Sequence, residues 1–255
     1  MKIAIVSGAS SGIGREFVRQ LSKREGEHIE EIWLIARRED LLQELVSEIN
    51  MPLRIFALDL LKPNSFLVLK ETLQILQPQI HCLVNAAGYA KFGEALQIKE
   101  EDSLGMIDLN CRALVALTQL ALPYMTSGDR IINIASTASF FPLQYANIYS
   151  ASKVFVLYYS KALAFELKKK HIGVTALTPG PVQTDFWEIA SESMPLKSLS
   201  QSIFRSTPEK VVKKALKDAF RGKTVSTPGC SNVLHKIMAK LLPTCFLMWV
   251  WEKIR

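Results

Sequence analysis

Tyr149 and Lys153 have the residue types and the spacing that proton transfer requires. They stand at positions i and i+4 of an amphipathic stretch, so in a helix both side chains project from one face. A phenol has an ordinary pKa of about 10, and a neighbouring ammonium favours its ionised form. Such a pair alone usually marks a solvated helix face. Here Ser136 ends an apolar run upstream and further motifs accompany it, so the pair is a candidate catalytic site.

A glycine-rich turn near the start of the chain has the composition of a phosphate-binding loop. It follows the apolar run Ile3–Val6 and leads into an amphipathic stretch. Glycines let the backbone turn sharply and approach a pyrophosphate, whose charge is met by the free N–H groups of a helix N-terminus. The expected cofactor contacts are Gly8, Ser10, Ser11, Gly12, Ile13 and Gly14.

The same turn also spells Gly8-x-Ser10-x-Gly12, the pattern of a hydrolase nucleophile elbow. An elbow takes part of its oxyanion hole from a loop upstream of the nucleophile, and the few residues before Ser10 leave no room for one. The Gly-x-x-x-x-Gly-Lys-Ser/Thr spacing of a nucleoside triphosphatase loop is absent. Dinucleotide binding is therefore favoured over both alternatives.

The second apolar run ends on arginines where an NAD-binding fold usually places a carboxylate for the ribose 2′-hydroxyl. Ala36 is followed by Arg37 and Arg38. A guanidinium can pair bidentately with a 2′-phosphate, so Arg37, helped by Arg38 and Ser10, predicts NADP(H). The alternative is that both arginines merely begin the next helix in solvent.

Apolar runs of strand length alternate with stretches of helical period, which indicates βαβ units and a parallel sheet. Nearly all residues of the runs are apolar, as expected when helices cover both faces. We therefore predict a Rossmann-like doubly wound α/β fold of about seven strands in one domain over residues 1–255. The expected strands are Ile3–Val6, Ile32–Ala36, Leu53–Leu58, Ile80–Val84, Arg130–Ala135, Val174–Leu177 and, weakly marked, Thr224–Ser226. The expected helices are Gly12–Arg24, Asp40–Asn50, Ser65–Gln77, Glu101–Met125 and Tyr149–Lys170.

Composition excludes several classes of protein. The chain has 255 residues, 49% hydrophobic and 22% charged, which is an ordinary globular balance. Its net charge of +7 lies entirely in residues 208–255, and no basic stripe with aromatic platforms indicates nucleic acid. The four histidines lack metal-ligand spacing, and no metal is predicted. Four scattered cysteines without a secretory signal favour the reducing cytoplasm.

These motifs, in this order, resemble the short-chain dehydrogenase/reductase family over residues 1–185. The resemblance rests on the glycine loop, Asn85-Ala86-Ala87-Gly88, Asn110, Ser136, the Tyr149/Lys153 pair and the segment from Pro179 to Thr184. It implies hydride transfer between a nicotinamide and a carbonyl or alcohol carbon. Ser7 and Ala86 depart from the usual residues of the family, but neither change removes a chemical function.

The resemblance also implies roles for the catalytic residues. Ser136 would donate a hydrogen bond to the substrate carbonyl, and Tyr149 would act as general acid in reduction or as general base in oxidation. Lys153 would lower the pKa of the tyrosine and hold the nicotinamide ribose. Asn110 would hold a water that links the lysine to solvent.

The cofactor contacts implied by the resemblance lie in three further segments. Asp59 and Leu60 would neighbour the adenine ring. The turn formed by Asn85, Ala86, Ala87 and Gly88 would shape the cleft. The nicotinamide would be bounded by Pro179, Gly180, Val182 and Thr184.

The expected substrate side is wide and apolar. By the resemblance, it is lined by Phe140, Phe141, Tyr145, Phe186 and Trp187, with residues 186–207 as a lid. Such a lining suits a hydrophobic ketone or secondary alcohol, steroid-like or fatty-acyl, although some of these rings could simply belong to the core. The alternative function is a regulatory protein that binds the cofactor without turnover.

Residues 230–255 form an apolar and basic extension that is the part least like the family. It is too short and too interrupted by Pro243 to span a bilayer. Packing on a partner subunit or covering the substrate entrance is favoured slightly over contact with an anionic membrane surface. By resemblance, a homodimer or homotetramer is expected.

Overall fold

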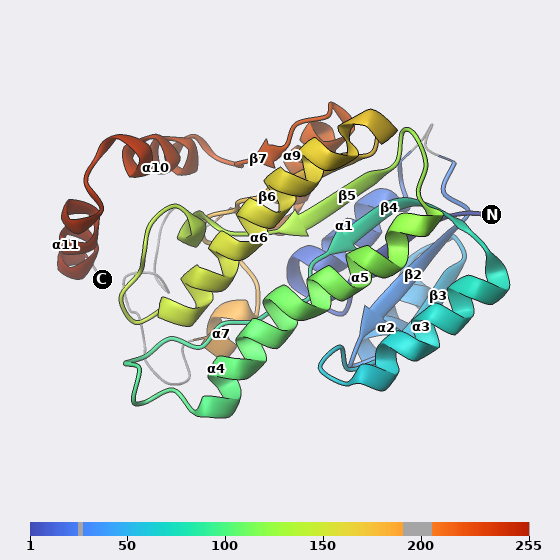
Figure 1. Cartoon of the computed structure of the whole chain (residues 1–255). Coiled ribbons are helices and arrows are strands. Elements are labelled where there is room, and N and C mark those ends of the chain that lie inside the picture. The colour runs from blue at the N-terminus through green and yellow to red at the C-terminus, as the bar shows by residue number, and fades with distance from the viewer. Residues whose placement is uncertain (25–27, 191–205, 255) are drawn as a thin grey trace.

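The structure, a computed structural model, describes residues 1–24, 28–190 and 206–254. Its centre is a parallel sheet of seven strands in the order β3-β2-β1-β4-β5-β6-β7 (Figure 1). The predicted doubly wound fold is thereby confirmed. The strands are β1 Lys2–Ser7, β2 Glu31–Ala36, β3 Leu53–Ala57, β4 Gln79–Asn85, β5 Arg130–Ile134, β6 Gly173–Leu177 and β7 Val225–Ser226.

Helices cover both faces of this sheet. One core layer is closed by α1, α2 and α9, and the other by α3, α5 and α6. The helices are α1 Gly12–Leu21, α2 Glu39–Glu48, α3 Pro63–Leu76, α4 Glu100–Ile107, α5 Leu114–Ala121, α6 Asn147–Glu166, α7 Phe186–Ala190, α9 Pro208–Phe220, α10 Cys230–Leu241 and α11 Thr244–Ile254.

Strand β1 shows why its apolar run is continuous. Ala4 and Val6 belong to the core layer under α1, whereas Ile3 and Ile5 belong to the layer under α3 and α5. Successive side chains of a strand point to opposite faces, so a strand buried on both faces needs apolar residues at every position. All four of these residues are buried.

The strand order reverses beside β1, which pairs with β2 on one side and with β4 on the other. In open parallel sheets, ligands bind beyond the carboxyl ends of the strands at such a reversal. The glycine loop follows β1 and the Asn85 turn follows β4, so topology alone brings these two motifs together.

The expected helix over residues 101–125 is subdivided in the structure. Helix α4 passes through a π-helical turn, Asp108–Ala113, into α5, and a 3-10 turn, Leu122–Tyr124, ends it. The π-helical turn carries Asn110, whose side chain bonds the neighbouring helix and loop. A π-helical turn inserts one extra residue into a helix and hardly changes the spacing of its apolar residues. The sequence pattern therefore predicts one continuous helix.

The C-terminal extension folds as α10 and α11, which lie together at one end of the molecule (Figure 1). Pro243 separates them, as expected from its missing N–H. Most of the expected lid, residues 191–205 of 186–207, lies outside the described residues. Over the described part of the chain, no helix is both long enough and apolar enough to cross a membrane.

Candidate active site

A cavity of about 1230 Å³ runs along the carboxyl ends of the strands, from the glycine loop to the C-terminal helices. Tyr149, Lys153 and Ser136 line its middle. Every expected cofactor contact lines it except Asn85, which is buried beneath it. The cavity therefore joins a nucleotide cleft to an apolar chamber, with the candidate catalytic residues between them.

The glycine loop is held by close backbone packing that only glycine permits. Gly8 has φ +68°, and a Cβ there would stand 2.8 Å from backbone atoms of Ala86 and Ala87. A Cβ on Gly14 would stand 2.1 Å from the carbonyl oxygen of Gly8. Both glycines are thus needed to bring α1 and the turn after β4 against the loop.

Ser7 ties the two turns together. Its hydroxyl accepts hydrogen bonds from the backbone N–H groups of Ala86 and Ala87, at 3.1 and 3.2 Å. Its replacement of the usual family residue therefore leaves a working hydroxyl in place. The first turn of α1 carries no acidic residue, and no side chain caps its N–H groups. Those groups suit the negative charge of a pyrophosphate.

Arg38, rather than Arg37, is fixed to the glycine loop. Its guanidinium donates to Ser10 Oγ at 3.2 Å and to Ser11 Oγ at 2.9 Å. Arg37 also lines the cavity, and its charge acts to lower the pKa of Tyr89, although burial dominates and raises that pKa. The structure therefore brings together Ser10 and Arg38, and it places Arg37 at the same mouth.

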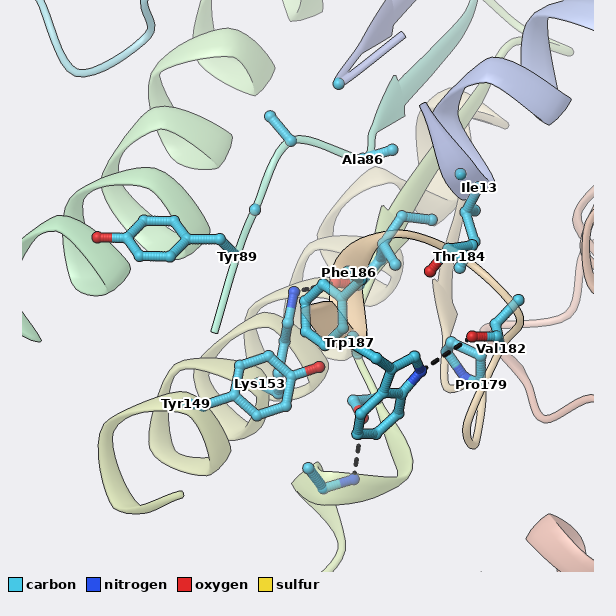
Figure 2. A pocket seen from close by; sticks show the side chains of 18 of the residues that line it. Ile13, Ala86, Tyr89, Tyr149, Lys153, Pro179, Val182, Thr184, Phe186 and Trp187 are labelled. Carbon is cyan, nitrogen blue, oxygen red and sulfur yellow. Dashed lines mark hydrogen bonds between the residues drawn. The ribbon is translucent and has the colours of Figure 1, made fainter. Parts of the chain in front are cut away.

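Tyr149 and Lys153 lie together on the first turns of α6 (Figure 2). Ser136, just after β5, hydrogen-bonds Tyr149 and lines the same cavity. Burial raises the pKa of Tyr149 to about 12, while a hydrogen bond with Ser136 acts to lower it. Burial also lowers the pKa of Lys153 to about 8. The lysine ammonium donates to the carbonyl oxygen of Ile134 at 2.9 Å and lies 5.7 Å from the centre of the Tyr149 ring. Desolvation, not the lysine charge, governs the tyrosine pKa in this arrangement.

Asn110 is a buried connector that does not line the cavity. Its amide donates to Ser152 Oγ at 3.0 Å and to the Tyr89 carbonyl at 3.1 Å, and its oxygen accepts from the Tyr89 N–H at 3.1 Å. It therefore ties the segment after β4 to the helix that carries Tyr149. Its expected role in holding a water stays a prediction.

Asn85 has a comparable position under the cleft. Its side-chain amide donates to Thr118 Oγ1 at 3.0 Å and to Asn133 Oδ1 at 2.8 Å. These bonds join β4 to α5 and β5, so Asn85 shapes the cleft from below. Pro179, Gly180, Val182 and Thr184 also line the cavity, and their expected contact with the nicotinamide stays a prediction.

Aromatic rings surround Tyr149 on the substrate side. The ring centre of Phe92 lies 5.9 Å from that of Tyr149. On another side, the ring centre of Phe186 lies 5.8 Å from that of Tyr149 and 5.7 Å from that of Trp187 (Figure 2). The indole N–H of Trp187 donates to the Val182 carbonyl at 2.9 Å, which fixes the orientation of its ring. These contacts give the cavity an apolar wall directly beside the phenol.

Two of the expected substrate contacts are placed elsewhere. Phe141 lines the cavity, but Phe140 and Tyr145 do not. Phe140 packs between α6 and α10, where its ring meets His235 at 5.8 Å. Tyr145 sits in a turn at φ +64°, and its carbonyl accepts a hydrogen bond from Gly93.

The far wall of the cavity comes from α10 and α11, which sequence reasoning offered only as one alternative. It is formed by Leu234, His235, Met238, Leu247, Val250 and Trp251. The amphipathic period of residues 230–255 could have predicted that these helices pack on the rest of the chain. It could not show which face of each helix meets the cavity.

The residues present fit a nicotinamide dinucleotide. The glycine cradle tolerates no Cβ at Gly8 or Gly14, the first turn of α1 is uncapped, and Lys153 stands where the cleft meets the chamber. Such a coenzyme would supply or accept the hydride. The chain itself provides a neutral phenol at Tyr149, a hydroxyl at Ser136 and a chamber with apolar walls.

A doubly wound sheet with this cradle and this Ser, Tyr and Lys arrangement defines a dinucleotide-dependent oxidoreductase. A family model described as short chain dehydrogenase matches residues 2–194. The chain belongs to the short-chain dehydrogenase/reductase family, whose oxidoreductases act on CH–OH and C=O groups with NAD(P)(H). The resemblance stated from the motifs is confirmed.

Individual relatives cover most of the chain. A 17-beta-hydroxysteroid dehydrogenase type 3 from Mus musculus is 30% identical over 247 residues, covering 94% of this chain and 74% of that protein. A very-long-chain 3-oxoacyl-CoA reductase from Macaca fascicularis is 30% identical over 263 residues, covering 98% and 77%. A solved short-chain dehydrogenase from Sphingobium yanoikuyae in complex with NADPH superposes with a TM-score of 0.78 at 26% identity, covering 94% of each chain.

Proposed function

We propose that the protein is an NADP(H)-dependent oxidoreductase that interconverts a bulky hydrophobic ketone and its secondary alcohol. The observation that carries this proposal is the continuity of the cavity. The catalytic residues line the junction between a cradle suited to pyrophosphate and a chamber walled by aromatic and aliphatic side chains. Two relatives named for a hydroxysteroid and a very-long-chain oxoacyl substrate support the same class of substrate.

Tyr149 is the proposed proton donor in reduction. Its phenol is neutral at physiological pH because burial raises its pKa to about 12. Ser136 is the proposed donor to the carbonyl oxygen, since it hydrogen-bonds Tyr149 and lines the same part of the cavity. Lys153 is proposed to hold the coenzyme ribose, and Asn110 to position the helix and loop around it.

The preference for NADP(H) is supported by two arginines, Arg37 and Arg38, that line the cavity beside the glycine loop. Arg38 is held by Ser10 and Ser11, and Arg37 lines the same edge. No carboxylate stands at the end of β2, where an NAD-specific site needs one for the ribose 2′-hydroxyl. Solved members of this fold include NADPH and NAD complexes, so the residues at this mouth carry the proposal.

The substrate lining proposed for the chamber is Phe141, Phe186 and Trp187, joined by Phe92. Phe140 is proposed to act only through His235, which it contacts and which lines the cavity. Assembly as a homodimer or homotetramer is also proposed. Exposed rings of Phe155, Tyr158 and Phe165 on α6 support it, because large apolar side chains rarely stay in solvent together.

The test has two steps. Fluorescence titration with NADPH and NADH measures the preference, and absorbance of the reduced nicotinamide then follows turnover against steroid, acyl and small polar ketones. Tighter binding of NADPH with turnover of one bulky ketone class supports the proposal. Binding without turnover on any ketone or alcohol would favour a regulatory protein, and turnover restricted to small polar ketones would overturn the substrate class.

A further inference from the structure

Helices α10 and α11 each turn one face toward the cavity. Leu234 and Met238 of α10 and Leu247 and Trp251 of α11 line it. Helix α11 is fastened to the body by Gln144, whose amide donates to the Met248 carbonyl at 3.2 Å. The Trp251 indole donates back to the Gln144 carbonyl at 3.4 Å. Helix α10 meets the body through His235, whose ring centre lies 5.8 Å from that of Phe140 and 5.1 Å from that of Phe141. Both helices are therefore in contact with the body of the protein.

The adjacent faces of the two helices expose large apolar side chains that do not line the cavity. Val233, Ile237 and Leu241 of α10, at i, i+4 and i+8, are 41%, 48% and 77% exposed. Phe246 and Trp249 of α11 are 44% and 56% exposed, and their rings stack with centres 6.1 Å apart. These five residues are named here the outer apolar face.

The outer apolar face is flanked by lysines. Lys236 and Lys240 follow one edge of α10, and Lys253 lies one turn beyond Trp249. Residues 230–251 contain no Asp or Glu. Burial, followed by repulsion from Lys240 and from Lys161 of α6, lowers the pKa of Lys236, so these cations gather at one place.

We propose that the outer apolar face docks on the surface of a lipid bilayer that contains anionic phospholipid. Apolar side chains beside lysines are the combination that holds a helix in the headgroup layer, with the lysines at the phosphates. A second copy of the chain is a poorer occupant. A two-fold interface would bring the lysines of one subunit toward the same lysines of the other, without carboxylates between residues 230 and 251 to pair with them.

Docking through this face would place lipid next to the apolar end of the cavity. Leu234 and Met238 face the cavity on the helix whose neighbouring face is Val233, Ile237 and Leu241. A hydrophobic substrate dissolved in the bilayer would thus have a short apolar path to the chamber. Only this delivery rests on the proposed function; the docking itself does not.

Sedimentation with vesicles tests the docking without any turnover. Full-length protein is spun with phosphatidylcholine vesicles that contain, or lack, phosphatidylglycerol. We expect binding to the anionic vesicles that weakens with added salt and is lost in the I237S/W249S variant. The matched control is I75S, which changes an apolar residue of α3 that is 79% exposed.

The lysines provide a second, quantitative arm. A lysine near an anionic surface raises the partition coefficient about fivefold, so K236Q/K240Q should lower it about 25-fold. The control K168Q/K169Q removes two exposed lysines far along the chain from this face and should leave binding unchanged. Circular dichroism and NADPH binding verify that each variant is folded.

Brominated lipid reports the depth of insertion. It should quench the tryptophan emission of the wild-type protein more than that of W249F, since Trp249 is the exposed indole of α11. The proposal is overturned if the protein stays in the supernatant with anionic vesicles, or if I75S weakens binding as much as I237S/W249S. Loss of a dimer by I237S/W249S in sedimentation equilibrium, without vesicle binding, would assign the face to a second copy. Vesicle binding by an inactive protein would refute the proposed function and leave the docking intact.

Discussion

Replacing Lys153 by methionine should stabilise the protein relative to the wild type most strongly at low pH. The lysine is buried, and its pKa falls from 10.5 to about 8. That shift corresponds to a desolvation cost of about 3 kcal/mol while the ammonium is charged. Methionine removes this cost but leaves the Ile134 carbonyl without the donor it has at 2.9 Å, an opposing loss of about 1 kcal/mol.

The pH dependence of stability separates the desolvation cost of the ammonium from the loss of the hydrogen bond to Ile134, because only the desolvation cost changes with pH. Between pH 8 and 10.5 the unfolded wild-type chain holds the lysine proton and the folded chain does not. Stability of the wild type therefore rises with pH in this window, by about 1 kcal/mol from pH 7 to 9, relative to the Lys153→Met variant. The raised pKa of Tyr149 acts above pH 10 and is common to both proteins.

Urea unfolding followed by far-ultraviolet circular dichroism at pH 7, 8 and 9 measures the difference. Lys168→Met is the matched control, because it makes the same substitution at an exposed lysine. If the free energies of unfolding of the wild type and of Lys153→Met differ by the same amount at all three pH values, the ammonium is not desolvated in the native protein. The assignment of Lys153 as a buried charge kept at a cost in stability would then be refuted.

Three further outcomes are expected. Tyr149→Phe should lower kcat by about 10²- to 10⁴-fold and leave the Kd of NADPH within about twofold, measured by steady-state kinetics and fluorescence titration; retained turnover would contradict the proton-donor role. Arg38→Ala should weaken NADPH at least about tenfold more than NADH, because a charge-assisted bond to a 2′-phosphate is lost; equal losses would remove the preference argument. Gly14→Ala should lower stability by about 2 kcal/mol in chemical unfolding, since its Cβ would stand 2.1 Å from the Gly8 carbonyl, and an unchanged midpoint would show that the loop yields freely.

The fold, and the grouping of Ser136, Tyr149 and Lys153 around one cavity, could be predicted because local patterns determine them. Strands buried on both faces must be apolar throughout, as β1 and β2 are, and a parallel topology brings the ends of such strands to one edge. The Tyr149/Lys153 spacing shares a helix face whatever surrounds it. Boundaries shifted by up to four residues, because the ends of helices and strands depend on contacts outside the element.

Side-chain placement in turns could not be predicted in the same way. Phe140 and Phe141 are adjacent in sequence, yet only Phe141 lines the cavity, because neighbouring residues at the end of a 3-10 turn point in different directions. Arg37 and Arg38 present the same problem, and a hydrogen bond to Ser10 singles out Arg38. The placement of α11 depends on Gln144, more than 100 residues earlier, which bonds both Met248 and Trp251. No local pattern carries that information.

The pKa shifts of Tyr149 and Lys153 point in opposite directions for one physical reason. Burial disfavours charge, so it raises the pKa of the phenol to about 12 and lowers that of the ammonium to about 8. In water the pKa values of a phenol and an ammonium are nearly equal, so moving the proton from the phenol to the amine changes the free energy very little. In this site the two pKa values are far apart, and the neutral phenol is strongly favoured. If Tyr149 is the proton donor we propose, its resting state is already the one that reduction of a ketone requires. Alcohol oxidation would first need the phenolate, and of the causes acting on this phenol only the hydrogen bond with Ser136 favours it. Desolvation therefore fixes which protonation state this phenol has at rest.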